Sequence, residues 1–136
     1  MVLVTDAMSA MGLEGGNHHL GNKSVEIRHE NENSTVRSAY ILGTNVLCGA
    51  VATINECVQN LTKSTGCSIE HAIRCASEHP AKMLGIFPRK GSLNFGADAD
   101  FIIIDDQVNV HATFINGDIV WSRKNWTPLF KFKTIV

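Results

Sequence analysis

The sequence predicts an α/β chain in which the end of a larger α/β domain runs into a small β domain. Three observations carry this prediction. A short β-type run stands at the N-terminus, apolar residues recur at helical spacing over residues 50–63, and after Pro88 the apolar residues come in short runs or at a period of two. Strand, hairpin, helices and strands in this order fit the end of a larger domain better than a self-contained fold.

The first predicted elements are a buried strand and a hairpin. Residues 2–5 are rich in β-branched side chains and lead into Asp6, which would stand at the C-terminal end of that strand. Residues 24–28 and 36–42 are β-type stretches separated by the polar segment 30–34, a pattern that predicts a hairpin.

Helices are predicted next along the chain. The apolar positions of residues 50–63 lie on one helical face, and Ser68 can cap a second helix. Pro80 can begin a short third helix, because the first turn does not need its missing N–H.

The C-terminal part is predicted to consist of strands. Apolar runs cover residues 101–104, 112–115 and 119–121, and Asn116-Gly117 between the last two is a strong hairpin turn.

Composition limits the class of protein. Of the 136 residues 44% are apolar and 18% charged, which is typical of a folded globular domain. No apolar stretch approaches the roughly 20 residues that span a bilayer, and the N-terminus does not resemble a signal peptide, so we expect a cytoplasmic protein without membrane contact. Four of the basic residues lie in residues 123–136, a tail of unknown role, and the acidic remainder predicts no nucleic-acid binding.

Candidate chemical groups are few. The six histidines form no His-x-His or His-Glu-x-x-His motif and no close cluster with the cysteines, so a complete zinc site is not expected. His18 and His19 are interpreted as a surface-loop pair. Asp6 is of interest because barrel enzymes place catalytic groups at strand ends, although position alone favours a strand-ending or helix-capping role.

Four motifs change that interpretation because of their order. The run at residues 3–7 followed by Gly12, the stretch at 43–49, the segment at 76–85, and residues 90–93 leading into 96–101 resemble N-acetylglucosamine-6-phosphate deacetylases of the amidohydrolase superfamily. The last two motifs are typical of the whole superfamily, whereas Leu-Val-Thr-Asp-Ala and Leu-Cys-Gly are specific to the deacetylases. The resemblance covers roughly residues 2–122.

The resemblance implies a fold and a site. Residues 1–87 would be the end of a metal-dependent hydrolase TIM barrel, with its last strand, a hairpin insertion and helices, and residues 88–122 would be strands of a small β-sandwich. Asp6 would be the catalytic aspartate that ends the eighth strand. Leu47, Cys48 and Gly49 would lie against the bound amino-sugar phosphate, although the family usually has Ser at Cys48 and a hydroxyl residue at Ala50.

The resemblance also implies a metal and a partner subunit for the complete enzyme. The complete enzyme would use a divalent metal, zinc or similar, whose ligands are expected upstream of Met1, with Asp6 as a possible further ligand. We therefore expect the chain alone to hold no metal and to be inactive, and the complete enzyme to be a homodimer. Two alternatives stay open: a non-catalytic subunit of the full-length enzyme, and an amidohydrolase that acts on a different amide.

Overall fold

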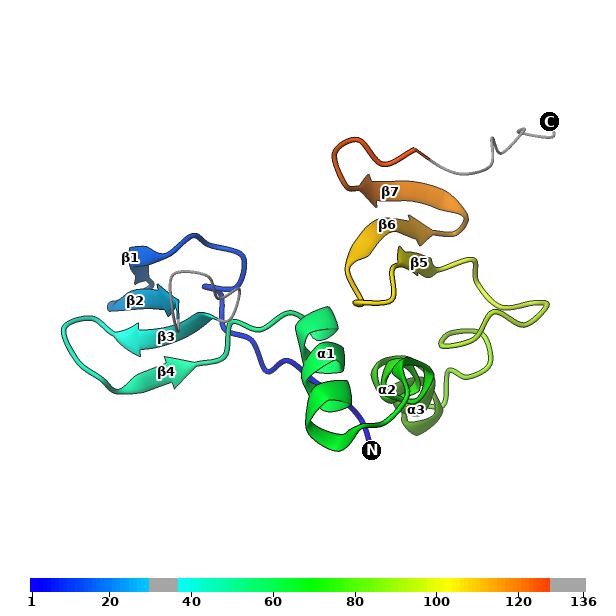
Figure 1. The fold of residues 1–136 in the computed structure, drawn as a ribbon, viewed down its shortest axis with the longest axis horizontal. Coiled ribbons are helices and arrows are strands. Elements are labelled where there is room, and N and C mark those ends of the chain that lie inside the picture. The colour runs from blue at the N-terminus through cyan, green and yellow to red at the C-terminus, as the bar shows by residue number, and fades with distance from the viewer. Residues whose placement is uncertain (30–36, 128–136) are drawn as a thin grey trace. The chain divides into compact units, whose positions relative to one another are not determined.

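The structure is a computed structural model that describes residues 1–29 and 37–127 (Figure 1). It divides into two compact units, Met1–Ala76 and Ser77–Val136, and each is described by itself. The polar segment 30–34, Val36 and the end of the tail lie outside the described residues. The predicted domain boundary after residue 87 concerns the complete enzyme and stays a prediction.

The first unit contains a four-stranded antiparallel sheet, in the order β1-β2-β3-β4 (Figure 1). Its strands are β1 (Gly16–Leu20), β2 (Lys23–His29), β3 (Arg37–Ile41) and β4 (Leu47–Gly49). The pairing of β2 with β3 confirms the predicted hairpin. The outer strands β1 and β4 were not predicted.

The two faces of this sheet differ, because successive strand residues point to opposite sides. Ile27 and Ala39 lie on the buried face and pack with Ala10 and Val51 into a small core. Glu26 and Arg28, which flank Ile27 in β2, belong to the other face.

The predicted buried strand at residues 2–5 is wrong for this structure. These residues form no strand, and the Val4 side chain is 72% exposed. The Leu3 N–H instead donates to the carbonyl oxygen of Cys75 at 2.8 Å, and the nearest parallel pairing is the single bridge between Ala7 and Ala50. A buried parallel strand needs hydrogen-bonded neighbours and covered faces, which the described residues do not provide here.

Three helices follow the sheet: α1 (Ile54–Thr65), α2 (Ile69–Ala76) and α3 (Glu78–Met83). The first begins four residues later than the periodicity indicates, because the Thr53 N–H donates to the Glu56 carboxylate at 2.7 Å and so fixes the helix start. The Ser68 cap is confirmed, since its Oγ accepts from the His71 N–H at 3.2 Å. The last helix begins two residues before Pro80, which is still within the first turn, where proline is tolerated.

The second unit contains a three-stranded meander of β5 (Phe101–Ile104), β6 (Val110–Ile115) and β7 (Asp118–Ser122). The Phe101 and Phe114 rings stack across β5 and β6 with centroids 4.3 Å apart. Asn116 and Gly117 have φ values of 51° and 85°, as a tight hairpin turn requires, and confirm the predicted turn. Within residues 1–29 and 37–127, no helix has the length and apolar character needed to cross a membrane.

Candidate functional site

Asp6 is exposed and has an unusual backbone conformation. Its φ is 45°, in the left-handed region that L-residues other than Asn and Asp rarely enter. After this residue the chain runs beside the end of β4, where the Met8 N–H donates to the Ala50 carbonyl oxygen at 2.9 Å. Asp6 therefore stands directly before the segment that pairs with the end of β4.

The parallel bridge of Ala7 with Ala50 brings the two predicted site segments together. Asp6 directly precedes Ala7, and Gly49 directly precedes Ala50. Because the two segments run parallel, Asp6 and Gly49 occupy neighbouring positions. A Cβ atom added at Gly49 would lie only 2.9 Å from the Met8 sulfur. The absence of a side chain at residue 49 thus lets the segment after Asp6 approach β4 closely.

The residues that are predicted to contact the substrate differ in their exposure. Leu47 is 61% exposed, whereas Cys48 is partly buried and packs against the core that contains Ile27 and Ala39. Leu47 is therefore the exposed residue of this strand, and Cys48 and Gly49 are both partly buried.

The residues of the described chain do not fit a metal centre. Among residues 1–29 and 37–127, no group of three or more His, Cys, Asp and Glu side chains could hold a metal ion. His18 and His19 lie in β1 and not in the predicted loop. The His18 ring nitrogen contacts the Glu14 carbonyl oxygen at 2.8 Å and the His19 ring contacts Ser24 Oγ at 2.9 Å, since neighbouring strand residues point to opposite faces.

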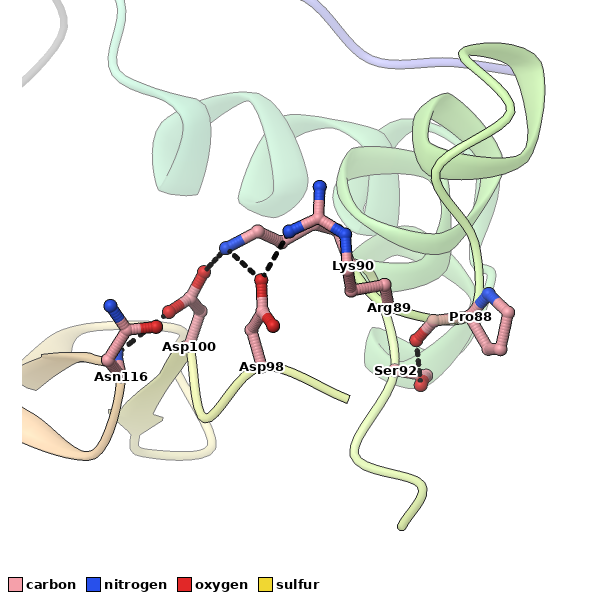
Figure 2. Close-up of polar contacts among 7 residues, drawn as sticks. All are labelled: Pro88, Arg89, Lys90, Ser92, Asp98, Asp100 and Asn116. Atoms are coloured by element: carbon pink, nitrogen blue, oxygen red, sulfur yellow. Dashed lines mark hydrogen bonds and ion pairs between the residues drawn. The ribbon is translucent and has the colours of Figure 1, made fainter. Parts of the chain in front are cut away.

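A second polar cluster lies in the other unit, around Lys90 (Figure 2). The Lys90 ammonium contacts Asp98 at 2.8 Å and also contacts Asp100. Arg89 reaches Asp98 at 2.8 Å, and Asp100 accepts the Asn116 N–H at 2.9 Å. The hydrogen bonds from Lys90 lower the pKa of both carboxyl groups.

This cluster explains the superfamily motif at residues 90–101 as a structural one. Its positive and negative charges neutralise each other, and its contacts connect the loop before β5 to the β6–β7 turn. The charged side chains of the cluster are therefore already engaged with one another and with the backbone. The pair of Asp6 and β4 is consequently the better candidate site.

Sequence reasoning did not identify Met8 as part of this site. The one signal that could have pointed to it is Gly49, because a glycine at the end of a short strand indicates the close approach of another segment.

Comparison with known proteins gives a consistent result. Residues 8–120 match the amidohydrolase family. The chain is 46% identical over 128 residues to N-acetylglucosamine-6-phosphate deacetylase from Bos taurus, an alignment that covers 94% of this chain and 30% of the bovine protein. It therefore spans about 30% of the length of that curated relative.

Two solved structures show the same fold. The deacetylase from Thermotoga maritima matches 90% of this chain and 31% of its own, with a TM-score of 0.72 and 29% identity. An aspartate-to-alanine variant of the Mycobacterium smegmatis enzyme, in complex with N-acetyl-D-glucosamine-6-phosphate, matches 88% of this chain and 30% of its own, with a TM-score of 0.70 and 27% identity.

Proposed function

Since this chain belongs to the amidohydrolase family, we propose that it forms the C-terminal part of an N-acetylglucosamine-6-phosphate deacetylase. The observation that carries the proposal is the identity of 46% to the bovine deacetylase, combined with a fold that brings Asp6 beside Leu47–Gly49. The reaction would release acetate from the amino-sugar phosphate and leave glucosamine 6-phosphate.

In the proposed reaction, Asp6 moves the proton. Amide hydrolysis forms a bond between a water oxygen and the acetyl carbon and breaks the bond from that carbon to nitrogen. The water must lose a proton and the departing amine must gain one. An exposed carboxylate such as that of Asp6 can accept the first proton and return it to the nitrogen.

The strand Leu47–Gly49 is proposed to hold the sugar beside Asp6. Leu47 offers an exposed apolar side chain, whereas Met8 occupies the space that a Cβ atom at Gly49 would need. Cys48, where the family usually has Ser, faces the core and would contribute packing instead of a sugar contact.

We propose that the divalent metal of the complete enzyme is bound by residues outside this chain. The described residues offer no ligand set, so the proposal places the metal ligands in the part of the relatives' length that this chain does not span. When bound, that metal would acidify the attacking water and polarise the amide carbonyl, while Asp6 would move the proton. Residues 2–5 would become the last strand of a TIM barrel where its neighbouring strands are present, and residues 88–122 part of the β-sandwich.

The second candidate function is a non-catalytic subunit that pairs with a full-length copy. One observation favours it: the largest fully buried side chains in the described residues are only Val25 and Cys75, while several larger apolar side chains are exposed. The homodimeric state and the cytoplasmic location of the complete enzyme stay predictions.

A chimera distinguishes these functions. In the bovine deacetylase, the segment that this chain matches is replaced by residues from this chain, and the release of acetate from N-acetylglucosamine 6-phosphate is measured. Activity within about tenfold of the bovine parent supports the proposal. A folded, metal-loaded chimera without activity contradicts it, and co-elution of the separate chain with the intact bovine enzyme would then favour the subunit.

A further inference from the structure

The strand β4 has few bonds of its own to fix its position. It is three residues long and stands last in the sheet, and on its other side, among the described residues, only the single bridge of Ala7 with Ala50 follows it. Its pairing with β3 carries an irregularity, because Ala39 is opposite Gly49 whereas Tyr40 is opposite Leu47. Such a bulge disrupts the ladder locally, so the turn before β4 has a large part in setting where the strand lies.

Arg28 in β2 reaches across the sheet to hold that turn. Its Nη1 donates to the Asn45 side-chain oxygen at 2.9 Å, and its Nη2 donates to the Thr44 carbonyl oxygen at 2.8 Å. A guanidinium group can make both bonds at once because its donors form a rigid planar fork. Two successive residues of the turn are thus attached to one side chain of a well-paired strand.

The charge of Arg28 is already matched inside the sheet. Its Nη2 lies 2.6 Å from the Glu26 carboxylate, and its guanidinium carbon lies 4.5 Å from the centre of the Tyr40 ring. Glu26 is directly opposite Tyr40, and Tyr40 is opposite Leu47, so these contacts lead across one face to β4. A cation with a carboxylate partner and an aromatic partner is suited to holding structure and poorly suited to capturing a phosphate.

We infer that Arg28 is a positioning residue for the strand Leu47–Gly49: it fixes the turn at residues 43–46 and through it the backbone that contacts the sugar. This inference rests on the proposed function, because the strand needs that position only if it binds substrate. Arg28 itself touches no reacting atom.

Hydrogen exchange on the 136-residue chain tests the positioning apart from any activity. The Ile41 N–H bonds to the Val46 carbonyl at 2.9 Å and the Thr44 N–H bonds to the Ile41 carbonyl at 3.0 Å, so both amides report on the turn. Arg28→Met should speed their exchange about tenfold or more and leave the β1–β2 amides unchanged. Unchanged exchange at both amides overturns the inference.

Kinetics on the bovine chimera test the consequence for binding. Arg28→Lys keeps a cation beside Glu26 but cannot make the fork, so its melting temperature should stay near the parent value while its KM rises about tenfold. Arg28→Met should show the same rise, and kcat should change by less than about twofold in either variant. Lys23→Met, at the exposed start of β2, is the matched control and should leave KM unchanged.

The outcomes distinguish the positioning role of Arg28 from the proposed function. A KM within about twofold of the parent in both variants, or a lower kcat with an unchanged KM, overturns the positioning role. An inactive chimera with Arg28 intact overturns the proposed function instead, and the exchange experiment still decides whether Arg28 holds the turn.

Discussion

Met8 fills the space beside Gly49 that a side chain at that residue would need. An added Cβ atom would lie 2.9 Å from the Met8 sulfur and 3.3 Å from its Cβ and Cγ atoms. Real Cβ contacts are almost never that short, so any residue other than glycine at position 49 must push Met8 away. Since Met8 follows Asp6 by two residues, this contact holds the segment after Asp6 against β4.

Gly49→Ala should therefore destabilise the chain by about 1–2 kcal/mol, the usual cost of overpacking a fitted contact. Met8→Ala in the same molecule should remove the clash, so the two changes should couple by about 1 kcal/mol in urea denaturation. Additive effects within about 0.5 kcal/mol would show that Met8 does not limit residue 49.

Asp6→Asn in the bovine chimera should lower turnover by about 10²-fold or more, because the amide keeps the volume of the side chain but cannot accept the proton. Substrate binding should change much less, and the metal content should stay the same. Acetate release and elemental analysis measure the two quantities.

Glu14→Gln is the control for this change, since Glu14 lies in the exposed loop before β1. Normal turnover of the Asp6→Asn chimera with unchanged metal content would show that Asp6 does not move the proton. Loss of metal together with activity would make it a ligand.

Gly91→Ala should destabilise the second unit by about 2–3 kcal/mol. Its φ is 76°, and an added Cβ atom would lie 2.8 Å from both the Ala81 Cβ atom and the Ser77 carbonyl oxygen. The Ser77 carbonyl oxygen belongs to the backbone and cannot move aside as a flexible side chain does. The steric clash therefore adds to the strain of a positive φ at a residue with a side chain. Gly96→Ala is the matched control, because its φ is 87° with no atom within 4 Å, and it should cost about 1 kcal/mol in thermal or urea unfolding.

The second unit should lose stability in acid through Asp105. The side chain and backbone N–H groups of Asn109 lower the pKa of this carboxyl from 3.8 to about 2, with a further contribution from His111. A carboxyl group whose pKa is lower in the folded than in the unfolded protein stabilises the fold at pH values above its unfolded pKa. This stabilisation is lost as the pH falls through the folded pKa. The loss should therefore fall between about pH 4 and pH 2.

Asp105→Asn should flatten this part of the pH profile, and Asp118→Asn, an exposed acid at the start of β7, should leave it unchanged. Asp105 also closes a turn in which the buried Val108 has a φ of 62°, so the turn depends on its bonds. Circular dichroism across a pH series in both variants measures the effect, and parallel profiles for Asp105→Asn and the unaltered chain would contradict it.

The chain alone should bind hydrophobic dyes and associate at high concentration. Leu93 is 80% exposed and Trp121 in β7 is 50% exposed, whereas the largest fully buried side chains of the described residues are those of Val25 and Cys75. Dye fluorescence and sedimentation velocity test this. A monomer that melts sharply and binds no dye would contradict it and indicate an independently stable domain.

Local signals made part of this fold predictable. The Ser68 cap, the Asn116-Gly117 turn and the β2–β3 hairpin depend on neighbouring residues, and the structure confirms each of them. The start of α1 was misplaced because periodicity alone does not detect a capping box.

Elements that depend on distant partners were not predictable in the same way. Residues 2–5 have the composition of a strand, but their conformation depends on which strands stand beside them. The strand β4 is too short to show a period of two, so only resemblance marked Leu47–Gly49 as a site. The contact of Met8 with Gly49 involves residues 41 positions apart in sequence, and no local pattern encodes it.

The ion pairs of Lys90 also bear on the order in which the second unit folds. Lys90 meets Asp100 at a separation of ten residues, a loop that an unfolded chain closes in about 10–100 ns. The entropy lost on closing so short a loop is small, and the contact positions Asp100 next to the first residue of β5. This loop is therefore expected to close ahead of the slower zippering of β5, β6 and β7, so that the charged motif nucleates the meander as well as stabilising it.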